Sequence, residues 1–264
     1  EVIQAEGKFA QTVIAVDVSS SMKARDLQPD RLANAKNMLS MLISNLKDER
    51  IGIIAFTTKA YIQCPITTDE AALKYFLSSL KPDMLPVPGT ALAAPVELAA
   101  QMLSKYPGQK ALILLTDGED HEPDQLKQAI KAALENGIRV IAVGIGTQEG
   151  ELIPQRVDAS GKVLEYKKDK NGNTVVSKLD EKSLLELAQA TNGAYIHYTT
   201  PAQVASKVET SLKDLDRSYS ASGSHARYKD RYQIPLGIAI LLFCLWLVWP
   251  AGKAAADAGS KKVQ

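Results

Sequence analysis

Short, uniformly apolar stretches alternate with amphipathic stretches along most of the chain. The apolar stretches are rich in β-branched and aliphatic side chains, which is typical of strands buried on both faces of a sheet. They cover residues 11–18, 50–56, 111–116, 138–145 and 194–198. The amphipathic stretches carry apolar side chains at helical spacing or helix-capping residues at their ends. We expect helices at 29–47, 68–80, 91–106, 123–135, 181–190 and 203–215.

This alternation predicts an α/β fold. Strands that alternate with helices form a mostly parallel sheet covered on both faces, and right-handed crossovers make it a doubly wound, Rossmann-like domain. Residues 59–64 are expected to fold back beside 50–56 as one antiparallel edge strand. The pattern breaks down between residues 150 and 178, where we expect a small surface hairpin that turns at Asn171 and Gly172. The domain is therefore expected over residues 11–217, with this hairpin insert at 150–178.

The two ends of the chain differ from this domain. Residues 1–10 form a lead-in, and the polar stretch at 218–232 has little to bury, so it predicts a linker. The segment at 233–250 is apolar; its roughly 16 uncharged residues would span about 24 Å as a helix, against ~30 Å for the hydrocarbon core of a bilayer. We expect a C-terminal transmembrane helix there and a polar tail at 251–264. Because lysines and arginines lie on both sides of the segment, charge does not indicate which side of the membrane holds the domain.

Composition and charge narrow the classes of function. The 264 residues are 45% hydrophobic and 23% charged, which suits a folded globular protein, and 31 basic against 30 acidic residues leave a net charge of +1. Without a basic excess or an arginine-rich stripe, nucleic acid is not an expected partner. The two cysteines, Cys64 and Cys244, lie in very different settings, so they do not predict a disulfide framework.

Oxygen-bearing side chains gather at the predicted carboxyl ends of the strands. Asp17, Ser19 and Ser21 are alternate residues of the turn after the first strand, so their side chains can converge on one point. Thr90 begins a helix after a glycine, and Asp117 follows the strand at 111–116. Ligands of open α/β sheets bind at this edge, and oxygen donors suit a hard cation such as Mg²⁺ or Mn²⁺. Asp and Ser are also common caps and turn formers, so only the combination of three segments predicts a metal site.

The three segments resemble the metal-ion-dependent adhesion site of von Willebrand factor A domains. The likeness rests on DVSSS at 17–21, on Gly89 and Thr90, and on TDG at 116–118. The order of strands and helices agrees over roughly residues 12–215.

This resemblance implies a role for each residue. Asp17, Ser19 and Ser21 would bind the ion, Thr90 would bind it directly or through water, and Asp117 would act through water. One coordination position would stay open for a carboxylate of a protein partner, which completes the octahedron that Mg²⁺ favours.

A closer likeness is to the membrane-anchored BatA and BatB proteins of bacteria. It rests on residues 16–22 and 27–31, on ERIGIIAF at 49–56, on residues 163–184 and on YKDRYQIPLGIAILLF at 228–243, and the insert favours BatB. These proteins are named for aerotolerance, usually accompany a MoxR-type AAA+ ATPase and typically carry membrane helices before the domain too. The likeness implies a protein of the bacterial inner membrane, with helices upstream of Glu1, that works with such an ATPase and other Bat-type proteins.

Other functions are also compatible with parts of the sequence. An Mg²⁺-dependent phosphatase-like hydrolase would use Asp17 as nucleophile, but that chemistry commonly needs a second carboxylate two residues on, where this chain has Ser19. A structural membrane scaffold, in which the metal only ties the loops together, is the other alternative. We expect a binding module and not an enzyme.

Three further residues follow Asp117 in the sequence. Glu119, Asp120 and His121 are explained by an acidic, solvated helix entry. Their closeness to the predicted ion also makes them candidates for the rim of a partner interface.

Overall fold

The central sheet is built from the apolar stretches of the sequence. The computed structural model describes residues 11–47, 49–222, 236–237 and 239–243. The six strands lie in the order β10-β5-β4-β1-β2-β3, and every neighbouring pair is parallel except β2 and β3. They are β1 (Gln11–Asp17), β2 (Ile51–Phe56), β3 (Ala60–Thr67), β4 (Lys110–Thr116), β5 (Ile138–Gly144) and β10 (Ala194–His197). The predicted parallel sheet with one antiparallel edge strand is confirmed.

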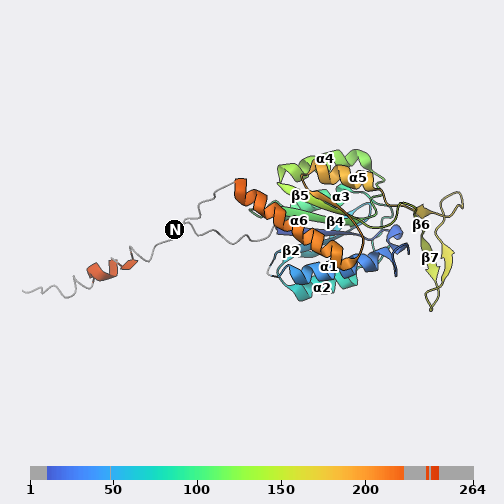
Figure 1. Ribbon diagram of the computed structural model, residues 1–264, viewed down its shortest axis with the longest axis horizontal. Helices are drawn as coiled ribbons and strands as arrows, with labels where there is room; N and C mark the ends of the chain where they lie inside the picture. Colours follow the sequence, from blue (N-terminus) through green and yellow to red (C-terminus); the bar gives the residue numbers. More distant parts are fainter. Residues whose placement is uncertain (1–10, 48, 223–235, 238, 244–264) are drawn as a thin grey trace, which may run out of the picture. The chain divides into compact units, whose positions relative to one another are not determined.

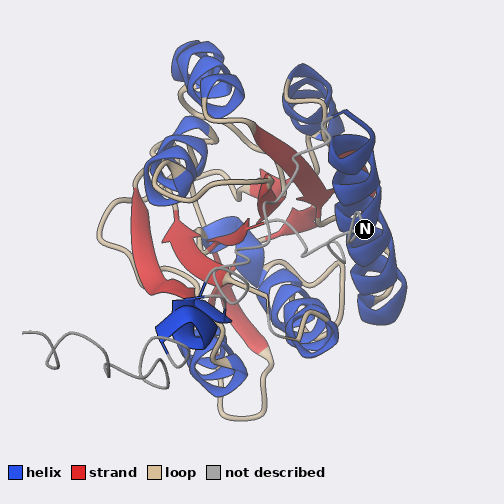
Figure 2. Cartoon of the chain, turned by 90° about the vertical axis from the view of Figure 1, so that its left-hand side faces the viewer, coloured by secondary structure: helices blue, strands red, loops and turns tan. Residues whose placement is uncertain are grey.

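Helices cover both faces of this sheet (Figures 1 and 2). One face is packed by α1 (Arg31–Asn45), α2 (Glu70–Ser79) and α6 (Pro201–Ser222). The other is packed by α3 (Ala93–Leu103), α4 (Pro123–Glu135) and α5 (Glu181–Ala190). Successive strand residues point to opposite faces, so each strand feeds both layers and must be apolar throughout. The last helix extends beyond the expected end of the domain at 217.

Side chains in β1 illustrate this division. Ile14 and Val16 belong to the core under α1, α2 and α6, while Val13 and Ala15 belong to the core on the opposite side. All four are fully buried. Because β1 is central and parallel to both neighbours, its carboxyl end lies beside those of β2 and β4. The residue that ends it, Asp17, is therefore delivered to the same edge as the loops after β2 and β4.

The insert between β5 and α5 differs from the expected hairpin. It contains β6 (Glu151–Leu152), β7 (Pro154–Val157), β8 (Val163–Tyr166) and β9 (Val176–Ser177). The partner of β8 is β7, and β6 pairs with β9, so the outer arms of the predicted hairpin, residues 163–166 and 176–177, do not pair with each other. The inner part of the hairpin does form around Asn171 and Gly172: Asp169 donates to the Asn173 carbonyl at 2.8 Å, Val175 donates to the Lys167 carbonyl at 2.9 Å, and Lys168 and Thr174 form an antiparallel bridge between them.

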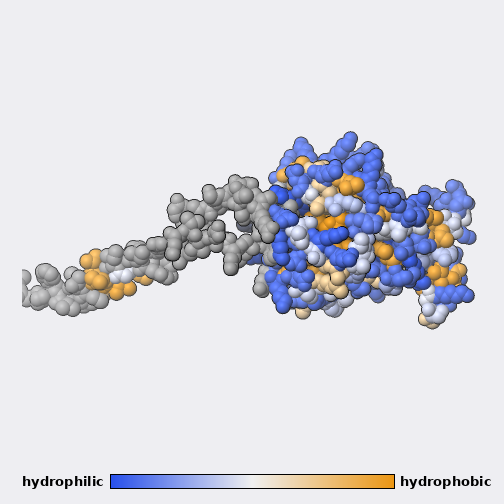
Figure 3. Space-filling model, in the orientation of Figure 1, coloured by the Kyte–Doolittle hydropathy of each residue, from blue (hydrophilic) through white to orange (hydrophobic). Residues whose placement is uncertain are grey.

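The insert stands at the carboxyl edge of the sheet, away from the N-terminal ends of the strands (Figure 1). Apolar side chains show on its surface (Figure 3), and Val157, Leu164, Tyr166 and Val176 are exposed. Ser177, the last residue of β9, behaves differently: its side chain is fully buried. The insert is thus not only surface decoration, because its end is packed into the sheet edge.

The predicted membrane segment at 233–250 lies mostly outside the described residues, as do the lead-in at 1–10 and the tail at 251–264. The described parts of this segment, residues 236–237 and 239–243, are helical and exposed. Within the described part of the chain, no helix has the length and apolar character needed to span a membrane.

Candidate metal centre

Asp17 lies at the centre of a hydrogen-bonded cluster at the carboxyl edge. One carboxylate oxygen, Oδ1, accepts the backbone N–H of Ser19 at 2.8 Å, and Oδ2 accepts the Thr116 hydroxyl at 2.6 Å. The hydroxyl oxygens of Ser19 and Ser21 are 2.8 Å apart. Ser21 belongs to a short 3₁₀ helix, η1 (Ser20–Lys23), which follows β1. Asp17, Ser19 and Ser21 therefore converge, as the sequence predicted.

Asp117 lies next to Asp17, one residue beyond the end of β4. Its Oδ1 accepts the Glu119 backbone N–H at 3.3 Å, while Oδ2 accepts the Ser177 hydroxyl at 3.0 Å and an Arg31 N–H at 3.1 Å. Both aspartates are fully buried. Burial and then the charge of Asp117 raise the pKa of Asp17 to about 7, against the lowering effect of its hydrogen bonds to Thr116 and Ser19. Such a buried acidic pair favours occupation by a cation.

Thr90 belongs to the loop before α3 and is buried. Its backbone carbonyl accepts the His121 backbone N–H at 2.9 Å, and its own N–H lies 3.2 Å from His121 Nδ1. Gly89 takes a positive φ of 95°, a conformation that suits glycine. These bonds join the second predicted loop to the third, although no described hydrogen bond links Thr90 directly to Asp17 or Asp117.

The candidate rim residues are tied to the surrounding loops. Glu119 accepts the Lys178 backbone N–H at 3.2 Å, and burial followed by the charge of Asp117 raises its pKa. Asp120 Oδ1 accepts the Glu122 N–H, whereas its Oδ2 is buried without a hydrogen-bond partner in the described structure. Together with His121 they line the loop after β4, next to the predicted ligands.

Arg31 is a component of the site that the sequence pattern did not indicate. It is the first residue of α1, and its guanidinium is fully buried. It pairs with Asp26, with Nη2 2.7 Å from Oδ2, and donates to the Ser177 hydroxyl at 2.7 Å. Although burial opposes ionisation of Asp26, its bonds to Arg31 and the charge of Arg31 lower the Asp26 pKa. A cation in the first turn of a helix opposes the helix dipole, and this is the local signal that could have drawn attention to it.

The donor set fits a hard divalent cation. Asp17, Ser19, Ser21, Thr90 and Asp117 offer only oxygen, and each is 5% exposed or less. Among the described residues, no three His, Cys, Asp or Glu side chains gather as a metal-binding group. The candidate centre combines two carboxylates with hydroxyls, so its protein ligands carry little negative charge, and oxygen donors of this kind suit Mg²⁺ better than a thiolate-preferring metal.

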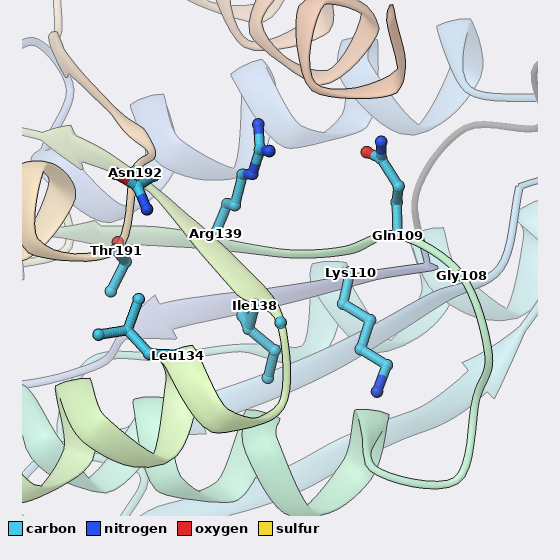
Figure 4. Close-up of a pocket in the computed structure, with 9 residues that line it drawn as sticks. Gly108, Gln109, Lys110, Leu134, Ile138, Arg139, Thr191 and Asn192 are labelled. Atoms are coloured by element: carbon cyan, nitrogen blue, oxygen red, sulfur yellow. The ribbon is translucent and has the colours of Figure 1, made fainter. Parts of the chain in front are cut away.

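A pocket of about 280 Å³ lies at the opposite end of the sheet (Figure 4). Residues from the starts of β4 and β5 and from the turn before β10 line it, among them Lys110, Arg139 and Asn192. Ligands of parallel α/β sheets bind at the carboxyl ends of strands, and this pocket lies at the amino ends. It contributes nothing to the candidate centre.

Comparison with known proteins places this geometry in context. Residues 12–119 match the family model of the von Willebrand factor type A domain. An aerotolerance-related membrane protein from Bacteroides fragilis has a similar structure, with 32% identity and a TM-score of 0.72, over 78% of this chain and 99% of that one. BatB from Bacteroides thetaiotaomicron, described as a conserved hypothetical protein, is 34% identical with the same TM-score, over 79% of this chain and 99% of that one.

Curated relatives are longer than this chain. A protein of Mycolicibacterium paratuberculosis described only as a UPF0353 protein is 24% identical over 200 residues, which is 71% of this chain and 55% of the relative. The chain thus spans about half the length of that relative.

Proposed function

Because this chain belongs to the von Willebrand factor A domain family, among its BatB-like, aerotolerance-related members, we propose that it is a metal-dependent protein-binding module. Asp17, Ser19 and Ser21 hold a divalent ion, Mg²⁺ or Mn²⁺, with Thr90 and Asp117 completing the protein's share of its surroundings. A carboxylate of a partner protein fills the remaining position. The ion supplies the Lewis acidity that makes this carboxylate bind.

The observation that carries the proposal is the charge of the donor set. Asp17, Ser19 and Ser21 lie together, and Asp117 lies beside Asp17. The loop of Thr90 is tied to the loop after β4 by backbone hydrogen bonds. Only two of these five side chains are carboxylates, and Arg31 already neutralises part of Asp117. A divalent ion held by so little negative charge attracts an external anion. The structural elements around it, β1, β4 and the loop before α3, are fixed by the core, so the position left for the partner is preorganised.

Each protein group has a separate task in this arrangement. Thr116 orients Asp17 by donating to Oδ2, which leaves the carboxylate unable to rotate freely. The Ser19 N–H holds the other oxygen and brings the Ser19 hydroxyl to the same side. The hydrogen bonds between Thr90 and His121 hold the second and third loops together. Position 19 is serine, so the second carboxylate expected for a phosphatase-like reaction is missing there, and a binding role is favoured over hydrolysis.

We place the module at the bacterial inner membrane. Support comes from the uncharged apolar segment at 234–249 and from the similar protein of Bacteroides fragilis, which is described as a membrane protein. A MoxR-type AAA+ ATPase and other Bat-type proteins are the partners we propose. Protease protection in spheroplasts reveals on which side of the membrane the domain lies. Recovery of the intact full chain in the soluble fraction without detergent would contradict the membrane anchor.

The experiment for the binding role compares capture in Mg²⁺ and in EDTA. The full chain, purified in detergent, is immobilised and exposed to solubilised native membranes and to a purified MoxR-type ATPase. We expect capture only with Mg²⁺, and its loss in Thr90→Ala. Thr68→Ala, an exposed threonine between β3 and α2, is the matched control and should capture normally. Capture that persists in EDTA and in Thr90→Ala would favour the scaffold alternative, and phosphate-ester turnover lost in Asp17→Ala would favour the hydrolase.

A further inference from the structure

A buried cation shares one of the predicted metal ligands. The Arg31 Nη1 lies 3.1 Å from Asp117 Oδ2, and both side chains are fully buried. The same oxygen accepts the Ser177 hydroxyl at 3.0 Å, and the Arg31 Nη1 also donates to that hydroxyl at 2.7 Å. Arg31, Ser177 and Asp117 Oδ2 therefore form a closed triangle. One oxygen of Asp117 is thus engaged before any ion binds, and the other, Oδ1, accepts the Glu119 backbone N–H at 3.3 Å.

The position of Arg31 is fixed from several directions. Asp26 accepts Nε at 2.9 Å and Nη2 at 2.7 Å, so the guanidinium is gripped as a fork. A Cβ atom added at Gly146 would lie 2.8 Å from the guanidinium carbon, so only glycine leaves room for it. A fully buried arginine with this many constraints is expensive to desolvate, and removal of one partner leaves an unpaired buried charge. Its cost indicates a role beyond filling space.

We propose that Arg31 is a positioning residue that competes with the divalent ion for Asp117, so that the domain holds the ion weakly until a partner carboxylate arrives. This inference rests on the proposed metal-binding function and adds its regulation. The physical reason is electrostatic: a fixed positive charge beside Asp117 repels the ion and cancels part of the attraction that Asp117 exerts. The shared Ser177 also ties the end of the insert to the same carboxylate.

The test measures Mg²⁺ and Mn²⁺ binding to the purified full chain by calorimetry. Arg31→Met removes the charge and keeps much of the side-chain volume; we expect it to bind Mg²⁺ roughly tenfold tighter or more, because a unit charge within several ångströms of a partly buried divalent ion is worth at least that much. Arg31→Lys keeps the charge and should stay near the wild-type affinity. Arg25→Met is the matched control, since it changes the net charge equally but Arg25 donates to Gly161 O and not to Asp117.

A double-mutant cycle separates this role from a purely structural one. Asp117→Asn should weaken Mg²⁺ binding only severalfold in the wild-type background, because Arg31 neutralises that carboxylate, and much more in the Arg31→Met background. Equal losses in the two backgrounds, or an Arg31→Met affinity no higher than that of Arg25→Met, would overturn the proposal. Where Arg31→Met does not fold without metal, Arg31→Gln, which is also uncharged but can still donate a hydrogen bond, replaces it in both experiments with the same expected outcomes.

The outcomes for the two proposals can be told apart. If wild-type protein binds neither Mg²⁺ nor Mn²⁺, the proposed metal-binding function fails, and with it this inference. If wild type binds the ion and the Arg31 variants do not change its affinity, only the inference fails.

Discussion

The carboxyl edge of the sheet buries polar side chains far more often than the amino edge does. Of the eleven buried polar or charged residues in the described part of the chain, nine lie at the carboxyl edge. They are Asp17, Ser19, Ser21, Arg31, Thr57, Thr90, Thr116, Asp117 and Ser177. Only Thr12 and Thr191 lie toward the amino edge, where Thr191 accepts the Val140 N–H and donates to the end of α5.

This difference is informative because burial of polar groups is costly. A buried polar group without a partner costs about 1–3 kcal/mol, and an ionised one costs more. The amino edge carries a pocket of about 280 Å³, yet the charged side chains that line it, Lys110 and Arg139, are partly exposed. A concave surface is therefore a weaker sign of function in this fold than an accumulation of buried, mutually bonded polar groups.

The largest effect that would sharpen this comparison is expected from Asp17→Asn. This change keeps the shape of the side chain and removes its charge, so we expect Mg²⁺ affinity to fall by about 100-fold, or about 2.7 kcal/mol. Calorimetric titration measures it. Asp69→Asn, which changes the charge equally at the amino edge and keeps an oxygen to cap α2, should leave the affinity unchanged. Similar losses in both variants would mean that net charge, and not the site, governs binding.

A change of pH is expected to have the next largest effect. The pKa of Asp17 is about 7 in the metal-free domain, and the ion requires the carboxylate, so binding should release a proton. Between pH 8 and pH 6, Mg²⁺ affinity should fall by about tenfold. Titrations in buffers of different ionisation enthalpy measure the released proton. Affinity that is constant across this range would contradict the buried acidic pair.

The same shift fixes the sign of the stability change without metal. A raised acid pKa stabilises the folded state below the unfolded value of 3.8, and this contribution is lost as pH rises toward about 7. The melting temperature of the metal-free domain should therefore drop over this interval, and Mg²⁺ should restore it more at pH 8 than at pH 6. Asp17→Asn should lack both effects.

Paired hydroxyl deletions at the two edges should have a smaller effect on binding. Thr116→Val and Thr191→Val each remove a buried hydroxyl and should each destabilise the domain by about 1–3 kcal/mol. Of these two threonines, only Thr116 donates to Asp17, so only Thr116→Val should also weaken Mg²⁺ binding, by several-fold. Chemical denaturation and calorimetry on the same samples separate stability from affinity. A loss of affinity in Thr191→Val would show that general loosening of the sheet explains both.

The smallest effect is expected at the amino-edge pocket. Lys110→Ala alters the pocket lining, but its side chain is partly exposed, so stability should change by about 0.5 kcal/mol or less. Metal binding and partner capture should not change. A measurable loss of capture in this variant would show that the pocket contributes to the partner interface.

Much of the fold was predictable because local signals agreed with tertiary ones. The bounds of α4, Pro123–Glu135, match the prediction because Pro123 suits the first helical turn and Asn136 with Gly137 ends it. The convergence of Asp17, Ser19 and Ser21 was also predictable, since a strand end and alternate turn positions set it. That these residues hold a metal stays a prediction.

The insert and Arg31 could not be predicted in the same way. In the insert, Asp158 Oδ1 accepts the N–H groups of Ser160 and Lys162, and this turn pairs β8 with β7 instead of with the later strand. The turn at Asn171 and Gly172 forms as well, so the insert carries two turn signals, and the sequence does not show which arms each turn pairs. Arg31 follows a helix cap and therefore looks like a solvated side chain. Its burial depends on Asp117 and Ser177, which no local pattern connects to it.

The distances along the sequence that these bonds bridge bear on how the protein folds. Thr116 and Asp17 are 99 residues apart, and Arg31 and Ser177 are 146 residues apart. Contacts of such long sequence separation form late, after the entropy of closing the intervening chain has been lost. The ion-binding position would then exist only once β1, β4 and the insert are all in place. Mg²⁺ should consequently slow unfolding and leave the refolding rate nearly unchanged, because the ion binds only after the transition state for folding has been passed.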